Sequence, residues 1–171
     1  MHPAIWRIVP LATPRLLRRC SRCDVQRPFA SSDRFRLNAN GRKVDVWLVY
    51  RCESCGISWN RTVLERRTPE EMGLDLYRRY ESNDTDLAWK HAFDVAGVAT
   101  ADDVPFRIDR SGNDVQAIVL QVPWPVGVRL DRLLSRELGI PRSRLERLFD
   151  RRTLRRPVRD GQIVEIGPTR A

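Results

Sequence analysis

Lysine is almost absent from this sequence, although the sequence is strongly basic. Of its 31 lysine and arginine residues only 2 are lysine, which leaves 29 arginines. The planar guanidinium group of arginine pairs with phosphate through two donors and stacks on nucleic-acid bases. Coding bias in a GC-rich genome also replaces lysine by arginine, and we assign most of the ratio to this bias. The distribution of the charge along the chain is therefore more informative than the ratio.

Long apolar runs are also absent, and none approaches the roughly 20 residues that span a bilayer. The apolar residues near the N-terminus are interrupted by Arg7, Pro10, Pro14 and Arg15, so they do not form the continuous core of a signal peptide. We therefore expect a cytoplasmic protein without a membrane partner. Thiols stay reduced in that compartment.

Sequence motifs of common enzyme classes are missing as well. The sequence has no glycine-rich phosphate loop, no nucleophile elbow and no HExxH metal pair. His91 is the only internal histidine, and no acid or nucleophile is placed to work with it. We expect His91 to be a hydrogen-bonded structural residue, and we predict that the protein is not an enzyme.

The composition that remains is that of a globular protein with a surplus of positive charge. The 171 residues are 42% hydrophobic and 31% charged, which suits one domain or two small ones. The net charge of +9 and the sequence pI of about 10.4 favour polyanionic partners such as nucleic acid.

The four cysteines form two CxxC pairs, Cys20 with Cys23 and Cys52 with Cys55, separated by 28 residues. Two such pairs at this separation are typical of a zinc ribbon. Zn²⁺ takes four thiolate ligands in a tetrahedron, and a shell of four cysteines leaves no open position for water or substrate. We therefore predict one structural Zn²⁺ per chain.

Other roles for the cysteines are disfavoured. Two disulfides are not expected in a cytoplasmic chain, ordinary buried thiols seldom fall in two matched pairs, and a redox CxxC needs only one pair in a βαβ setting. Four thiolates on one Zn²⁺ leave a double negative charge, which neighbouring arginines can offset. These neighbours are Arg18, Arg19, Arg22 and Arg51.

The patterning of the chain predicts an α+β protein. We expect an N-terminal antiparallel β zinc ribbon at 17–65, a helical segment at 66–100, and a C-terminal β-hairpin with two short helices at 104–169. Thr68, Pro69 and Glu71 have the spacing of a helix N-cap, an N-terminal proline and a capping box. Thr85 is expected to cap the next helix.

Two tryptophans of the ribbon, Trp47 and Trp59, admit two roles. Both lie in predicted strands, where their rings could stack on nucleic-acid bases. We favour the alternative that they pack beside the metal core.

Most of the positive charge lies in one segment, residues 129–159. It holds 11 arginines against four acids, Asp131, Glu137, Glu146 and Asp150. Leucines mark two short helices, which places the arginines outside and predicts a polyanion site. The residues expected to contact nucleic acid are Arg129, Arg132, Arg142, Ser143, Arg144, Arg147, Arg151 and Arg152.

The same segment resembles the S-four-type RNA-binding module. Arg129-Leu130-Asp131 matches the opening of that module, Arg142-Ser143 its Ser-Arg-Ser step, Leu148-Phe149 the end of its second helix, and Gly161 its late glycine. Pro141 replaces the first serine of the step, and Gln162 stands where the module has aspartate. The resemblance implies that the second helix and its loop lie against structured RNA.

A second resemblance covers nearly the whole chain. The segments "LRRCSRC", "DRFRLNANGRKVDVWLVYRCESCGISWNRTV" and "NDTDLAWKHAFD" are similar to the bacterial family catalogued as domain of unknown function 1062. This resemblance implies a cytoplasmic protein with a zinc ribbon and brings no activity with it.

These observations favour a non-enzymatic, zinc-containing RNA-binding protein, with ribosomal and transfer RNA as its candidate partners. Structured RNA is the expected partner, because arginines that meet phosphates read shape rather than sequence. The alternative is a protein-interaction or DNA-binding regulatory module built on the zinc ribbon, whose arginines face an acidic partner. An enzyme ranks last.

Overall fold

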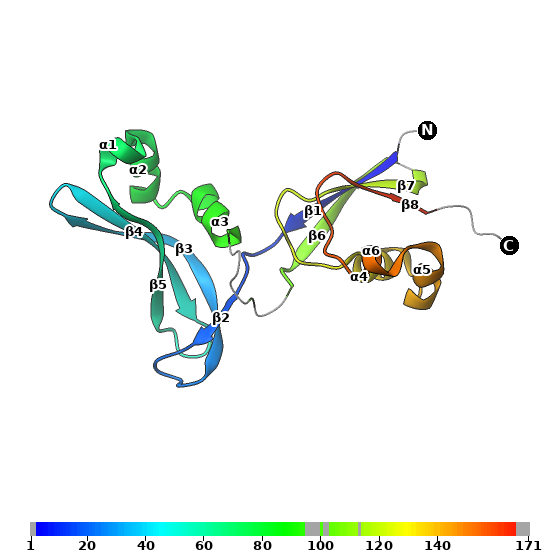
Figure 1. Ribbon diagram of the computed structural model, residues 1–171, viewed down its shortest axis with the longest axis horizontal. Helices are drawn as coiled ribbons and strands as arrows, with labels where there is room; N and C mark the ends of the chain where they lie inside the picture. The colour runs from blue at the N-terminus through cyan, green and yellow to red at the C-terminus, as the bar shows by residue number, and fades with distance from the viewer. Residues whose placement is uncertain (1–2, 95–99, 101–102, 113, 167–171) are drawn as a thin grey trace. The chain divides into compact units, whose positions relative to one another are not determined.

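The computed structural model describes residues 3–94, 100, 103–112 and 114–166. These residues form eight strands in two four-stranded sheets, together with six helices, which confirms the mixed α+β class. The chain divides into two compact units (Figure 1). We call Thr13–Asp102 the cysteine unit, and Met1–Ala12 with Asp103–Ala171 the split unit, because it is made of two separate stretches of chain.

The sheet of the cysteine unit is antiparallel throughout. Its strands, in the order β2-β3-β4-β5, are β2 (Leu16–Arg19), β3 (Gln26–Asn40), β4 (Lys43–Cys52) and β5 (Ser58–Arg67). Side chains alternate between the two faces of a strand, and β4 does so over its whole length. Its buried residues are Val44, Val46, Leu48, Tyr50 and Cys52.

Three helices follow this sheet and cover the face that holds the buried residues. They are α1 (Pro69–Met72), α2 (Leu74–Glu81) and α3 (Thr85–Phe93). Tyr80, Leu87, Ala88 and Ala92 join the core formed by β3 and β4. One face of the sheet is therefore buried against the helices, and the other face lies outside this core.

The capping box predicted at Thr68 is present. The backbone N–H of Glu71 donates to Oγ1 of Thr68 at 3.2 Å, and the backbone N–H of Thr68 donates to the Glu71 carboxylate at 2.9 Å. Gly73, with φ +85°, ends α1 after one turn and separates it from α2. The prediction that Thr85 caps the next helix is wrong by one residue, because the carboxylate of Asp84 accepts from the N–H of Leu87.

The split unit is built around a strand from the N-terminus. Its strands, in the order β6-β1-β7-β8, are β6 (Phe106–Ser111), β1 (Pro3–Pro10), β7 (Asp114–Gln121) and β8 (Gln162–Glu165). Strand β1 is antiparallel to β6 and parallel to β7. Figure 1 shows β1, in blue, between the green β6 and the yellow-green β7.

The prediction that β6 and β7 pair with each other as a β-hairpin is therefore wrong. Both of its strands exist, but β1 lies between them and takes the hydrogen bonds that a hairpin would form. Gly112 lies in the connection where the chain passes the start of β1. Its φ is +78°, and a Cβ there would lie 2.9 Å from the carbonyl oxygen of Pro3, so only glycine fits without a shift.

Three short helices cover one face of this sheet. They are α4 (Leu130–Leu138), α5 (Arg142–Leu148) and α6 (Arg151–Leu154). Their buried leucines are Leu130, Leu133, Leu134, Leu145 and Leu154, and the core side chains of the sheet include Trp6, Ile8, Ile118 and Leu120. Apart from the buried Asp131, the polar residues of these helices are exposed or half-buried. Within the described residues, no helix is long and apolar enough to cross a membrane.

Replacement of Ile8 should test the central place of β1. Ile8 is fully buried on the dry face of the sheet, and Ile5, on the same strand, is half-exposed on the other face. We expect Ile8→Ala to lower the free energy of unfolding of the split unit by roughly 2–5 kcal/mol, and Ile5→Ala to lower it by about 1 kcal/mol or less. Chemical denaturation followed by circular dichroism measures both. Equal losses of unfolding free energy in the two variants would contradict the observed pairing of β1.

Candidate metal centre and basic helical segment

The two CxxC segments fold into turns with the same hydrogen bonds. In the first, the N–H of Cys20 donates to the carbonyl of Val25 at 3.0 Å, and the N–H of Asp24 donates to the carbonyl of Cys20 at 2.9 Å. In the second, Cys52 and Ile57 are joined at 2.9 Å, and Gly56 donates to Cys52 at 2.8 Å. The fourth residue after each leading cysteine has a left-handed backbone, with φ +56° at Asp24 and +74° at Gly56.

These turns bring the four thiols together. All four are free thiols, and their Sγ atoms lie within 4.8 Å of one another, with 3.5 Å between Cys20 and Cys55. Four sulfurs at about 2.3 Å from a central ion in a tetrahedron would be about 3.8 Å apart. The four thiols are therefore already at the spacing of a metal-binding site. Cys20 and Cys52 are buried, whereas Cys23 and Cys55 are half-buried.

The electrostatics of the cluster favour a cation at its centre. The backbone N–H of Cys23 donates to Sγ of Cys20 at 3.4 Å and helps to lower the pKa of the Cys20 thiol to about 6. Hydrogen bonding to Cys55, with burial and the neighbouring thiols, raises the pKa of Cys23 to about 12. Cys20 therefore loses its proton readily, and its negative charge opposes the ionisation of Cys23. A bound cation removes this opposition, because it attracts every thiolate.

The arginines predicted to offset the charge of the site have separate roles. The guanidinium of Arg18 lies 3.9 Å from the ring centroid of Trp59 and 5.6 Å from that of Phe29. Arg19 pairs with Asp24 at 2.7 Å, and Arg22 donates to the carbonyl of Cys55 at 3.4 Å. Burial lowers the pKa of Arg18, while the charge of Cys20 acts in the opposite direction.

The two tryptophans on the strands of this unit face opposite sides of the sheet. Trp59 packs inward, with its ring 5.5 Å from that of Tyr50 and 6.3 Å from that of Phe29. Trp47 lies outside this core and has the guanidinium of Arg36 at 6.0 Å from its ring. The predicted packing role therefore applies to Trp59.

His91 takes no part in the metal centre. A hydrogen bond of 2.9 Å joins the hydroxyl of Tyr80 to Nε2 of His91, and the two rings are stacked. The guanidinium of Arg61 donates to the carbonyl of His91 at 2.6 Å and to that of Asp94, and so binds the C-terminal end of α3. Burial, with the charges of Arg61 and Lys90, lowers the pKa of His91.

The eight residues predicted to contact nucleic acid all lie on the three helices of the split unit or at their start. Arg129 precedes α4 and Arg132 lies within it. The second helix, α5, carries Arg142, Ser143, Arg144 and Arg147, and α6 begins with Arg151 and Arg152. We call residues 129–159 the basic segment. Apart from the half-buried Arg129, these eight residues are exposed.

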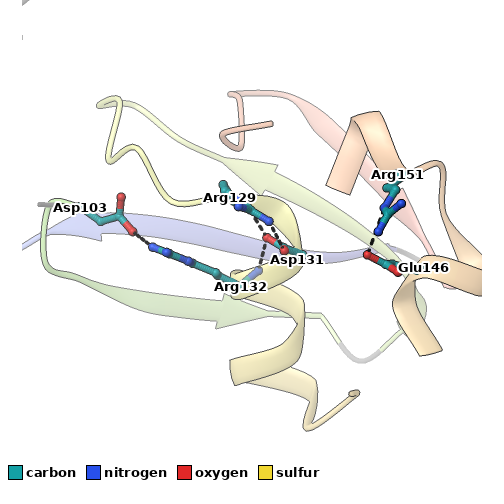
Figure 2. A network of polar contacts seen from close by, with 6 residues as sticks. All are labelled: Asp103, Arg129, Asp131, Arg132, Glu146 and Arg151. Atoms are coloured by element: carbon teal, nitrogen blue, oxygen red, sulfur yellow. Dashed lines mark hydrogen bonds and ion pairs between the residues drawn. The ribbon is translucent and has the colours of Figure 1, made fainter. Parts of the chain in front are cut away.

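Three of these arginines form ion pairs, which Figure 2 shows. Arg129 pairs with Asp131, which is only 6% exposed and also accepts the backbone N–H of Arg132. Arg132 pairs with Asp103 at 2.7 Å, and Arg151 with Glu146 at 3.4 Å. The pair at Arg129 fixes the start of α4, because it neutralises a buried carboxylate. The other two pairs are solvent-exposed and contribute about 0–1 kcal/mol each.

Other arginines of the basic segment form no ion pair with a carboxylate of the described residues. They are Arg142, Arg147, Arg152, Arg155, Arg156 and Arg159, and all are exposed. A hollow of about 290 Å³ lies at the end of the segment and is lined by Thr153, Arg156, Pro157, Arg159, Asp160, Gly161 and Gln162.

Comparison with known proteins identifies the family of the chain. The model of the family described as "protein of unknown function (DUF1062)" matches residues 37–159, which is most of the chain. The chain belongs to this family. The DUF1062 match includes the second cysteine pair and the whole basic segment, whereas β1 and the first pair precede it. No curated protein and no solved structure matches the chain significantly.

The sequence did not lead us to predict β1, although this strand is part of the sheet that supports the basic segment. Ala4, Trp6, Ile8 and Pro10 are buried at alternate positions, which is the pattern of a strand with one dry face. This alternation is visible in the sequence, but two prolines and Arg7 obscure it. The contact of Arg18 with Trp59 was also not expected, since it depends on the pairing of all four strands from β2 to β5.

The low pKa of His91 should make the cysteine unit sensitive to acid. The unfolded chain takes up a proton at the ordinary pKa near 6.5, whereas folded His91 remains neutral to a lower pH. Acidification through this window therefore favours unfolding. Between about pH 7.5 and about pH 5.5, we expect the urea midpoint to fall less in His91→Gln than in the wild type. Lys90→Gln, which removes a neighbouring charge but keeps the imidazole, is the control and should retain most of the fall. Equal falls in wild type and His91→Gln would contradict this assignment.

Proposed function

We propose that the protein is a non-catalytic, zinc-containing RNA-binding protein, and that the basic segment is its RNA-binding surface. The observation that supports this most directly is the set of six exposed arginines that form no ion pair with a carboxylate of the described residues. A positive face that serves only for solubility would need no such concentration. Unpaired guanidinium groups can form two-pronged hydrogen bonds with phosphate without first breaking an internal pair.

The ion pairs separate the predicted contact residues according to the energy that each would lose if it left its carboxylate to bind a phosphate. Arg132 and Arg151 hold exposed partners, so an RNA phosphate can replace Asp103 or Glu146 at little expense. Arg129 cannot exchange its partner in the same way, because Asp131 would be left buried without a counter-charge. We therefore assign Arg129 to positioning α4, and the arginines of α5 and α6 to phosphate contact.

RNA is favoured over duplex DNA by the shape of the basic segment and by its resemblance to the S-four-type module. Helices α5 and α6 have only 7 and 4 residues, and each carries its arginines on short turns rather than along one extended stripe. Short turns suit phosphates whose positions are set by a folded RNA, which proteins recognise largely by shape. Backbone contacts of this kind position a protein and carry little sequence information.

The four cysteines fit zinc as a structural metal. Zn²⁺ prefers thiolates, and four of them complete its tetrahedral shell. Cys20 and Cys52 belong to the apolar core together with Phe29, Leu48 and Tyr50, so the metal would link two turns to the interior of the sheet. With four protein ligands the metal would supply no reaction step, and its contribution would be the stability of the cysteine unit.

Metal analysis should show one equivalent of zinc in protein purified without added metal. Cys52→Ser should lose the metal and destabilise the cysteine unit, because it removes one ligand from the shell. Val46→Ala is the matched control, since it shortens another fully buried side chain of β4 but leaves all four ligands. We expect it to lower stability while retaining zinc. A folded wild-type protein without metal would disprove this part of the proposal.

A triple variant, Arg142→Ala, Arg147→Ala and Arg152→Ala, should test the RNA surface. Binding to a structured RNA such as transfer RNA is measured by filter retention across a salt series. For phosphate contacts, the logarithm of affinity falls linearly with the logarithm of salt concentration. We expect the variant to bind more weakly at every salt concentration, with a slope shallower by roughly 2–3.

The control removes the same charge elsewhere. Arg42→Ala, Arg67→Ala and Arg78→Ala together take three exposed arginines from the cysteine unit, where none of them forms an ion pair with the described residues. This control should keep most of the affinity and the slope. Equal effects of the two triple variants would mean that net charge alone drives binding. Retention of acidic proteins but not of RNA from cell extract would favour the protein-interaction alternative.

A further inference from the structure

The sheet of the cysteine unit has a second face that the helices do not cover. Because side chains alternate along a strand, the neighbours of the buried residues of β4 point to this side. We call the following set the outer face: Arg34 and Arg36 of β3, Asp45, Trp47, Val49 and Arg51 of β4, and Ser58, Asn60 and Thr62 of β5. None of these side chains belongs to the core cluster of the unit.

Strand register places these residues in rows across the sheet. Trp47 lies between Arg36 on β3 and Thr62 on β5. The next row places Val49 between Arg34 and Asn60. Neighbouring strands are about 4.8 Å apart, so each row is roughly 10 Å wide. The half-exposed ring of Trp47 is thus surrounded by polar and basic side chains rather than by an apolar patch.

The arginines of the outer face are available for an anionic ligand. Arg34, Arg36 and Arg51 are exposed, and none of them forms an ion pair with the described residues. The acid of the set, Asp45, accepts the backbone N–H of Arg66 at 2.8 Å and so holds the adjoining turn of β5. The guanidinium of Arg36 stands 6.0 Å from the ring centroid of Trp47, which leaves room to rearrange.

We propose that the outer face binds unpaired nucleotides of a single-stranded nucleic acid. The ring of Trp47 stacks on one base, while Arg36 beside it and Arg34 and Arg51 farther along the sheet bind neighbouring phosphates. Asn60 and Thr62 offer hydrogen-bonding groups to base edges in the same rows. A sheet that presents an aromatic ring among basic residues suits single strands, because every base has a face that can stack. A duplex hides those faces.

This site is distinct from the one proposed on the basic segment. It uses other residues in the other compact unit, and it engages bases rather than phosphates alone. The composition of the outer face also argues against a protein partner. Trp47 and Val49 are its only apolar side chains in the set named above, whereas protein interfaces need a larger apolar centre.

The test uses the full-length, zinc-loaded protein and a fluorescent oligouridylate of about eight nucleotides, with binding followed by anisotropy. Stacking on one base contributes enough that Trp47→Ala should weaken binding roughly 5- to 100-fold. Trp47→Phe keeps an aromatic ring and should retain most of the affinity. Arg36→Ala should weaken binding and reduce the salt slope by about 1, whereas Arg78→Ala, an exposed arginine on α2, should change neither.

The outcomes separate this site from the basic segment. If Trp47→Ala binds the oligomer as well as the wild type does, or if duplex RNA binds the outer face as tightly as the single strand, the inference is wrong. It is also wrong if only the triple variant of Arg142, Arg147 and Arg152 loses the oligomer, because the basic segment then binds it. Loss of the oligomer in Trp47→Ala, with structured RNA still bound, would establish the outer face independently. Comparison of oligouridylate with oligodeoxythymidylate then tells whether the ribose is recognised.

Discussion

The pairing of β1 with β6 and β7 is the constraint on which the rest of the structure depends. It joins the first strand of the chain to strands that follow roughly a hundred residues later, and it completes the sheet that supports the basic segment. The ends of the enclosed stretch are also brought together, because Pro10 pairs with Phe106 and the N–H of Leu11 donates to the carbonyl of Pro105 at 2.8 Å. The cysteine unit is therefore an insertion into the split unit.

The inserted cysteine unit has a core of its own. The cysteine unit buries a modest core between one sheet and three short helices. Two turns of matching geometry bring four thiols together at the end of that sheet. A metal bound there would link residues that are 35 positions apart and would reduce the freedom of the unfolded chain. The burial of Cys20 and Cys52 makes the site part of the core rather than an attachment to it.

Arginine serves three different purposes in this protein, although the residues look alike in the sequence. Arg129 neutralises a buried carboxylate, and Arg61 binds the carbonyl groups at the end of a helix. Arg18 covers an aromatic ring beside the metal centre. Arg142 and Arg147 of α5, Arg152 of α6, and Arg34 and Arg51 of the outer face form no ion pair with the described residues. Net charge alone therefore overstates the number of arginines that can bind a polyanion. The contacts of each arginine within the protein show which ones are available for it.

The sequence alone determined the local features of this protein. The spacing of the cysteines predicted their assembly, Thr68 and Glu71 predicted the capping box, and the leucines of the basic segment predicted helices that point their arginines outward. These features depend on residues that are near one another along the chain. Tertiary structure alone decided the place of β1, the loss of the predicted hairpin and the opposite orientations of Trp47 and Trp59. Each of these depends on pairing between strands that are distant in the sequence. The alternating pattern of a strand shows which of its side chains share a face, but it does not show which other strand it pairs with.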